Sequence, residues 1–234
     1  MPSTANAHTA SDYENELSEL RSGLLKMAGR VEQMIGMADK GLRDRDTDIV
    51  DKVVGEDRLV NRAELDIDGL CLRILALRQP MGPDLRFVTQ ALKMVTDLER
   101  IGDLAVNLAE RGRDLGELGA GPVHPGIHEM ADRTRAMVGD AIDAFVEGDV
   151  VKARAVLAAD DAVDDLYEKV FQDVLEKMRD NGEIHRGIHV QSAAKFLERM
   201  GDHSTNLAEQ VIFMLEGEDI RHPRSPRPSR PAEH

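Results

Sequence analysis

Two stretches of the sequence repeat a pair of carboxylates at the same spacing. Residues 98–110 read LERIGDLAVNLAE and residues 197–209 read LERMGDHSTNLAE, with nine of the thirteen positions identical. Each copy places a glutamate and an aspartate four residues apart, Glu99 with Asp103 and Glu198 with Asp202. Because residues four apart share one face of a helix, both copies predict a carboxylate pair on a single helical face.

The preceding segment of each half carries a matching pair of oxygen ligands. Aligning the halves on their acids pairs Asp57 and Asn61 with Asp161 and Asp165. If these faces oppose the repeated motifs, four carboxylate or amide oxygen donors converge in each half, and His203 lies beside the second set. Clustered carboxylates repel each other, and a bound cation removes that repulsion. All-oxygen sets suit Mg, Ca, Mn or Fe better than a structural zinc.

The candidate metal ligands are therefore eight residues, four in each half: Asp57, Asn61, Glu99, Asp103, Asp161, Asp165, Glu198 and Asp202. Gly102 and Gly201, inside the repeated motifs, are costly in mid-helix and are expected to let a neighbouring helix approach closely. A solvated acidic helix face is the alternative, and Asn107 and Asn206 are equally suited to hydrogen bonds between helices. The repetition of the acids in two diverged halves favours metal binding.

The elements that must position these residues are helices. Apolar residues recur at steps of three and four along the chain, beginning with Leu17, Leu20 and Leu24, and no stretch alternates with the period of a strand. A capping box formed by Ser11 and Glu14 predicts the start of the first helix. The chain is divided into six helices by breaks near residues 43–48, 79–83, 116–126, 147–149 and 180–187. The fold class is therefore expected to be all-α, and Gly217 is expected to be the C-cap of the sixth helix.

The six helices are expected to form two three-helix bundles, because the acidic motifs repeat once in each half. The predicted bundles span residues 11–118 and 127–217, joined by a Gly/Pro linker at 119–126. Residues 1–10 and the Pro/Arg-rich residues 218–234 are expected to be disordered tails.

Composition excludes several classes of function. The 234 residues carry a formal net charge of −14, which opposes binding to nucleic acids and anionic lipids. The single Cys71 excludes an internal disulfide. With no signal peptide and no apolar run of about 18 residues, we expect a soluble, cytoplasmic protein. The sequence holds no nucleophile–base set and no Gly-rich dinucleotide turn, which argues against an enzyme.

The stretch LRQPMGPDLR at 77–86, leading into LERIGD and followed by LERMGDHSTNLAE in the second half, resembles the PhoU family. The resemblance implies two pseudo-repeated three-helix bundles and a negative regulator of phosphate uptake and phosphate-starvation signalling. It implies contacts with the ATPase subunit of a phosphate ABC transporter and with a phosphate-sensing histidine kinase, and a homodimer is expected.

The resemblance also implies iron or zinc clusters, with Mn or Mg as further possibilities, held by E/D-x-x-x-D motifs. Three such motifs are present at Glu99/Asp103, Asp161/Asp165 and Glu198/Asp202. The fourth departs, since Asn61 follows Asp57, so the first half is expected to bind metal less tightly. A metal-dependent helical-bundle enzyme and a metal-free acidic scaffold remain the alternatives.

Overall fold

The computed structural model describes residues 4–44, 46–119, 121, 123–181 and 183–220. Over these residues the chain forms six helices and no strand, as predicted. The helices are α1 (Thr4–Asp44), α2 (Ile49–Arg78), α3 (Gly82–Glu117), α4 (Pro125–Glu147), α5 (Val150–Asn181) and α6 (Ile184–Glu216).

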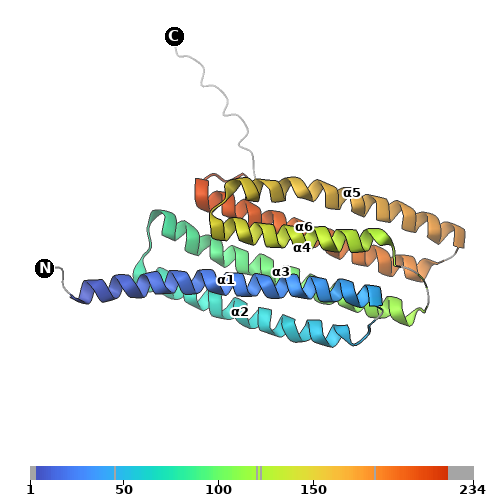
Figure 1. Cartoon of the computed structure of the whole chain (residues 1–234), viewed down its shortest axis with the longest axis horizontal. Coiled ribbons are helices and arrows are strands. Elements are labelled where there is room, and N and C mark those ends of the chain that lie inside the picture. Colours follow the sequence, from blue (N-terminus) through green and yellow to red (C-terminus); the bar gives the residue numbers. More distant parts are fainter. Residues whose placement is uncertain (1–3, 45, 120, 122, 182, 221–234) are drawn as a thin grey trace, which may run out of the picture.

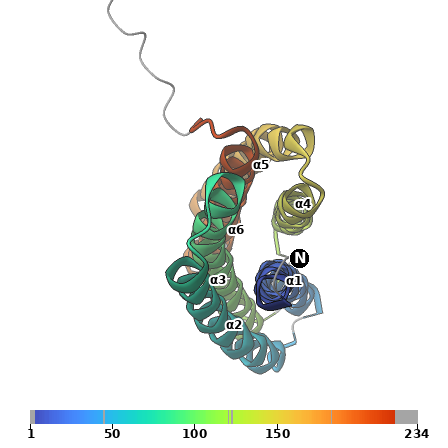
Figure 2. The ribbon, with the colours of Figure 1, turned by 90° about the vertical axis from the view of Figure 1, so that its left-hand side faces the viewer.

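The helices form two three-helix bundles that meet through α3 and α6. Helices α1 and α2 pack on α3, and helices α4 and α5 pack on α6. Seen end-on, α2, α3, α6 and α5 follow a curved row, with α1 and α4 on its inner side (Figure 2). Helices α3 and α6 run in opposite directions along each other (Figure 1). The two halves are thus related by an approximate twofold arrangement.

The predicted 3-4 periodicity forms the core. Leu20 and Leu24 of α1 are fully buried, as are Val60 of α2 and Leu98 of α3. Aliphatic side chains do most of the packing, in keeping with the low aromatic content. Cys71 lies within this core, and burial raises the pKa of its thiol to about 12, so the side chain packs as an apolar group.

The start of the first helix differs from the prediction. Helix α1 begins at Thr4 rather than at Ser11, so most of the predicted N-terminal tail is helical. Residues 4–22 contain neither glycine nor proline, so nothing in that stretch interrupts the helix. As a result α1 has 41 residues, whereas its counterpart α4 has 23.

The other breaks follow the chemistry of their residues. Gly217 ends α6 in the left-handed conformation (φ 73°) and donates its N–H to the Phe213 carbonyl at 2.8 Å, which confirms the predicted C-cap. The linker ends slightly earlier than expected, since α4 begins at Pro125. Of the predicted C-terminal tail, residues 218–220 are not helical and residues 221–234 lie outside the described residues.

Polar side chains fix how the two halves meet. Asp97 of α3 accepts hydrogen bonds from two amides of α6, Asn206 Nδ2 at 3.2 Å and Gln210 Nε2 at 2.6 Å. The same carboxylate lies 2.9 Å from His203 Nδ1. On the other side of the junction, His128 of α4 lies 2.5 Å from the buried Asp39 of α1. Three side chains of α6 in the second half therefore contact one carboxylate of the first half, that of Asp97.

Replacing Asp97 should loosen the junction between the halves. In Asp97→Ala the donors of Asn206, Gln210 and His203 lose their acceptor, at an expected cost of about 1–3 kcal/mol in the free energy of unfolding. Denaturant unfolding measures this cost. Asp140→Ala, on the exposed face of α4, is the control and should change stability little. Equal losses in the two variants would show that Asp97 does not hold the halves together.

Candidate metal centre

The glycine of each repeated motif faces the preceding helix of its own half. A Cβ added to Gly102 would lie 3.5 Å from Val60 Cγ1 and 3.7 Å from Asp57 Oδ1. A Cβ added to Gly201 would lie 3.6 Å from Val163 Cγ1 and only 2.9 Å from Asp160 Oδ1. The glycines thus allow a close approach of helices, as expected, and they bring an aspartate of the neighbouring helix beside each motif.

These contacts correct the predicted register of α5. Asp160, not Asp161, is the structural equivalent of Asp57, because each lies three residues before the valine that contacts the glycine. Asp164, rather than Asp165, is accordingly the equivalent of Asn61. Asp161 and Asp165 are both exposed. Aspartates occupy 160 and 161 as well as 164 and 165. Aligning only the acids of the two halves therefore fits Asp160 and Asp164 as well as it fits Asp161 and Asp165.

In the first half, the four predicted residues form a partly buried polar cluster between α2 and α3. Asn61 Nδ2 donates to Asp57 Oδ2 at 3.0 Å, while Asp57 Oδ1 and Asn61 Oδ1 are buried without any hydrogen-bond partner. Burial and then the charge of Asp103 raise the pKa of Asp57. Two buried oxygens are therefore available to a cation, at a place where negative charge is already costly.

Glu99 completes this first cluster. Burial and then the charge of Asp103 raise the pKa of Glu99, and Glu64 and Asp57 add to the effect. Arg100 lies 3.5 Å from Glu99 Oε2 and 3.6 Å from Asp103 Oδ2, so one basic side chain offsets part of the acidic charge.

In the second half, Asp160, Asp164, Glu198 and Asp202 form the corresponding cluster between α5 and α6. Burial, followed by the charges of Asp164 and Asp202, raises the pKa of Asp160 to about 6. Burial, followed by the charges of Glu198 and Asp164, raises the pKa of Asp202. Lys195 Nζ donates to Glu198 Oε1 at 2.6 Å, and Glu198 Oε2 is buried without a partner. Because Asp164 stands in place of Asn61, the four aligned positions hold four carboxylates here and three in the first half.

The donor set of both clusters fits a hard cation, since every donor is an oxygen and three buried oxygens have no partner. The side chains are not yet arranged around a common point. Among the described residues, no three acidic, imidazole or thiol side chains already surround one ion position. Holding a cation thus requires changes of side-chain rotamer, which exposed acids such as Asp164 and Asp202 can make.

His203 and Asn206, which the sequence placed near the second cluster, point to a different partner. Both contact Asp97 of α3 and so belong to the junction between the halves. For Asn206, the alternative of a hydrogen bond between helices is therefore the one that the structure shows. Asp97, Asp160 and Asp164 were not predicted as functional residues. An alignment of the apolar seam, Val60 with Val163, would have found the last two.

The chain is thus an all-helical protein built from two copies of one three-helix unit, each with an acidic cluster. A sequence model described as the PhoU domain matches it twice, over residues 24–112 and 127–211. The chain belongs to the PhoU family, whose members are regulatory accessory proteins rather than enzymes.

Similar proteins cover nearly the whole chain. A Pseudomonas putida protein named phosphate-specific transport system accessory protein PhoU homolog is 38% identical over 217 residues, which are 92% of this chain and 85% of that protein. The Escherichia coli (strain K12) accessory protein PhoU is 31% identical over 218 residues, 93% of this chain and 90% of that protein.

Solved structures agree with the fold. The crystal structure of PhoU from Pseudomonas aeruginosa matches with a TM-score of 0.85 at 37% identity, covering 88% of this chain and 100% of that one. The phosphate transport system regulatory protein PhoU from Streptococcus pneumoniae matches with a TM-score of 0.83 at 26% identity, over 89% and 99% of the two chains. No helix in the described part of the chain has an apolar stretch long enough to cross a membrane.

The acidic cluster of the second half should make the metal-free protein sensitive to pH. The pKa of Asp160 is raised from 3.8 to about 6 in the folded state, so folding favours its protonated form. Stability from this group is present in full below pH 3.8 and is lost as the pH rises through about 6. Asp160→Asn should therefore stabilise the protein at pH 7 and have a smaller effect at pH 4.

Denaturant unfolding in the presence of a chelator, at several pH values, measures the difference between variant and wild type. Asp161→Asn is the matched control, because Asp161 is adjacent in sequence but exposed. An equal pH-dependent gain in both variants would contradict the assignment of Asp160 to the cluster.

Proposed function

We propose that this chain is a negative regulator of phosphate uptake and of phosphate-starvation signalling. It acts by protein contacts with the ATPase subunit of a phosphate ABC transporter and with a phosphate-sensing histidine kinase. The observation that carries the proposal is the match of the PhoU domain to both halves, together with relatives named as accessory proteins of a phosphate-specific transport system. Such contacts require a cytoplasmic protein, and a homodimer would present two copies of each contact surface.

The physical character of the chain supports regulation through contacts. Long helices packed through an aliphatic core give a rigid surface, and the polar contacts at Asp97 and Asp39 hold the two halves in one relative position. The acidic surface, with a net charge of −14, favours partners with basic patches. The regulator would therefore act by occupying a partner surface.

The proposal includes one cation site in each half, whose residues are those of the two clusters. The first site comprises Asp57, Asn61, Glu99 and Asp103, and the second comprises Asp160, Asp164, Glu198 and Asp202. Iron, or else manganese or magnesium, suits carboxylate oxygens better than a structural zinc does, although zinc accepts carboxylate ligands too. A bound cation would supply positive charge that offsets the clustered acids, and these side chains would link α2 to α3 and α5 to α6.

A metal-free acidic scaffold is the second candidate. Arg100 in the first half and Lys195 in the second already contact acids of the clusters, so basic side chains can supply part of the compensating charge. On that reading a basic side chain of a partner, instead of a metal, would neutralise the remaining carboxylates. The two candidates differ in whether the isolated protein binds a cation.

Metal content should depend on the cluster residues and on which half they belong to. After incubation with Fe²⁺, Mn²⁺ or Zn²⁺ and desalting, Glu198→Gln with Asp202→Asn should lose more bound metal than Glu99→Gln with Asp103→Asn. The reason is that Asp164 adds a carboxylate where Asn61 offers an amide. Elemental analysis measures the loss of metal. In thermal melts, added metal should raise the Tm of the Glu198→Gln, Asp202→Asn variant less than it raises the Tm of the wild type.

The register offers a sharper control. Asp160→Asn with Asp164→Asn should remove the metal of the second half, whereas Asp161→Asn with Asp165→Asn, of equal charge change, should retain it. Equal metal content in all variants, or none in the wild type, would favour the metal-free scaffold.

The regulatory proposal has a test in the host cell. Deleting the gene should switch on phosphate-starvation genes when phosphate is plentiful, and a reporter fusion measures this. Complementation with the wild-type chain should restore repression. A host without another family member in which the deletion leaves the reporter silent would contradict the proposal.

A further inference from the structure

One end of the second half lacks a helical segment that the first half possesses, the N-terminal part of α1. Gly23 of α1 and Gly126 of α4 are equivalent, since a Cβ on Gly23 would lie 3.2 Å from Ile67 and one on Gly126 would meet Val170, the counterpart of Ile67. Before Gly23 the helix extends back to Thr4, but before Gly126 it holds only Pro125. The ends of α5 and α6 thus have no counterpart of residues 13–20, which pack over the ends of α2 and α3 in the first half.

In the first half this extra stretch is an acidic amphipathic helix that closes the end of α2 and α3. Leu20 is fully buried and Tyr13 donates its hydroxyl to Asp84 at 2.7 Å. Arg78 of α2 donates two hydrogen bonds to Glu16, at 2.8 and 3.3 Å. The chain itself therefore shows what kind of segment fits the end of such a helix pair.

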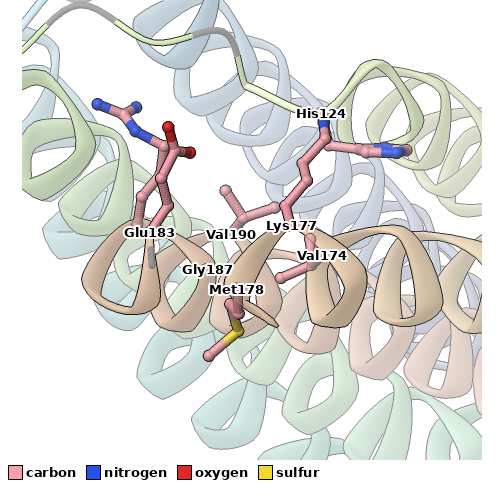
Figure 3. A pocket seen from close by; sticks show the side chains of 8 residues that line it. His124, Val174, Lys177, Met178, Glu183, Gly187 and Val190 are labelled. Atoms are coloured by element: carbon pink, nitrogen blue, oxygen red, sulfur yellow. The ribbon is translucent and has the colours of Figure 1, made fainter. Parts of the chain in front are cut away.

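The equivalent place in the second half is hollow. A pocket of about 190 Å³ lies there, which we call the end groove; it is lined by His124, Val174, Lys177, Met178, Glu183, Arg186, Gly187 and Val190. Figure 3 shows Lys177 and Glu183 on opposite sides of the opening, with Val190 between them. Val174 and Val190 form an apolar floor and are the counterparts of Cys71 and Ala91, which are fully buried in the first half.

The apolar surface continues beyond the end groove. A second pocket of about 280 Å³ shares Val174, Met178 and Gly187 with it. Phe171, Leu175 and Ile188 line this second pocket and are exposed. Large apolar side chains therefore surround one edge of the groove, as expected for a surface that a partner covers.

Charge determines which partner fits. Lys177 takes the position of Ile74, which is fully buried in the first half, yet Lys177 is exposed. Arg186 places its guanidinium at the groove, where it donates to the backbone carbonyls of Leu118, Gly119 and Gly121. Among the side chains that line the groove, two permanent cations outnumber the one acid, Glu183, in a chain of net charge −14, while Asp173, outside the lining, already pairs with His124 at 3.0 Å.

We propose that the end groove binds an acidic amphipathic helix of a partner protein, in the place that residues 13–20 take in the first half. The apolar side of that helix would cover Val174 and Val190, and its acids would face Lys177 and Arg186. A second copy of this chain is a poorer candidate, because its own acidic segment is already held by Arg78 and Asp84. This inference does not depend on the proposed role in phosphate signalling.

A synthetic peptide of residues 4–24, acetylated and fluorescently labelled, is the probe, since it is the acidic amphipathic helix that this chain already uses. Fluorescence anisotropy with the full-length protein should detect binding. Lys177→Glu should weaken that binding at least about tenfold, because a negative side chain then faces the acidic helix. A peptide with Glu16→Lys and Glu19→Lys should reverse the preference and bind the Lys177→Glu protein better.

Lys169→Glu, an exposed lysine of α5 outside the groove, is the matched control and should bind like the wild type. Both substituted positions are exposed, so circular dichroism melts should match those of the wild type. No binding of the peptide, or binding that Lys177→Glu and Lys169→Glu change equally, would overturn the proposal. Neither outcome bears on the phosphate-starvation reporter, so the two proposals fail separately.

Discussion

The packing of α3 against α6 joins the two halves of the protein and sets how they lie against each other. Polar contacts mark its whole length: Arg86 donates to the Met214 carbonyl at 3.0 Å near one end, and His189 lies 3.4 Å from Asp114 near the other. Between them, Asp97 gathers donors from α6. Because each of these groups is largely removed from water, sliding one helix along the other would leave several unpaired at once. This junction therefore fixes the register of the two halves. It also connects the two acidic clusters, because one cluster includes residues of α3 and the other includes residues of α6.

The two halves share one arrangement of three helices, and differences at single equivalent positions give them different surfaces. Where the first half has Asn61, the second has Asp164, so the two equivalent clusters differ in their number of carboxylates. Where the first half has the buried Ile74, the second has Lys177, so a core position becomes an exposed, charged one. The second change is possible only because α4 is shorter than α1 and leaves that position uncovered. A cation site and a docking groove of the kind proposed would then both be strongest in the second half.

Much of the fold could be predicted from the sequence, because the 3-4 apolar spacing and the Gly/Pro breaks are local signals. Leu20, Leu24 and Gly217 all take their predicted roles. The start of α1 was wrong because Ser11 and Glu14 have the pattern of a capping box inside a stretch that nothing interrupts. The α5 equivalents of Asp57 and Asn61 were placed one residue late, because adjacent aspartates satisfy two registers and only the contacts of Gly201 choose between them. The partnership of His203 with Asp97 and the end groove arise from packing between distant segments, which no local pattern encodes.

In the proposed metal site of the second half, the helix register brings Asp160 and Asp164, together with Glu198 and Asp202, around one cation. The most direct measurement is a crystal structure of the protein soaked in Mn²⁺, with anomalous scattering used to locate the ion. We expect an anomalous peak between α5 and α6, from an ion bound by oxygens of Asp160 and Asp202, and a weaker peak between α2 and α3 beside Asp57. A peak at Asp161 and Asp165, or no peak at either cluster, would contradict it.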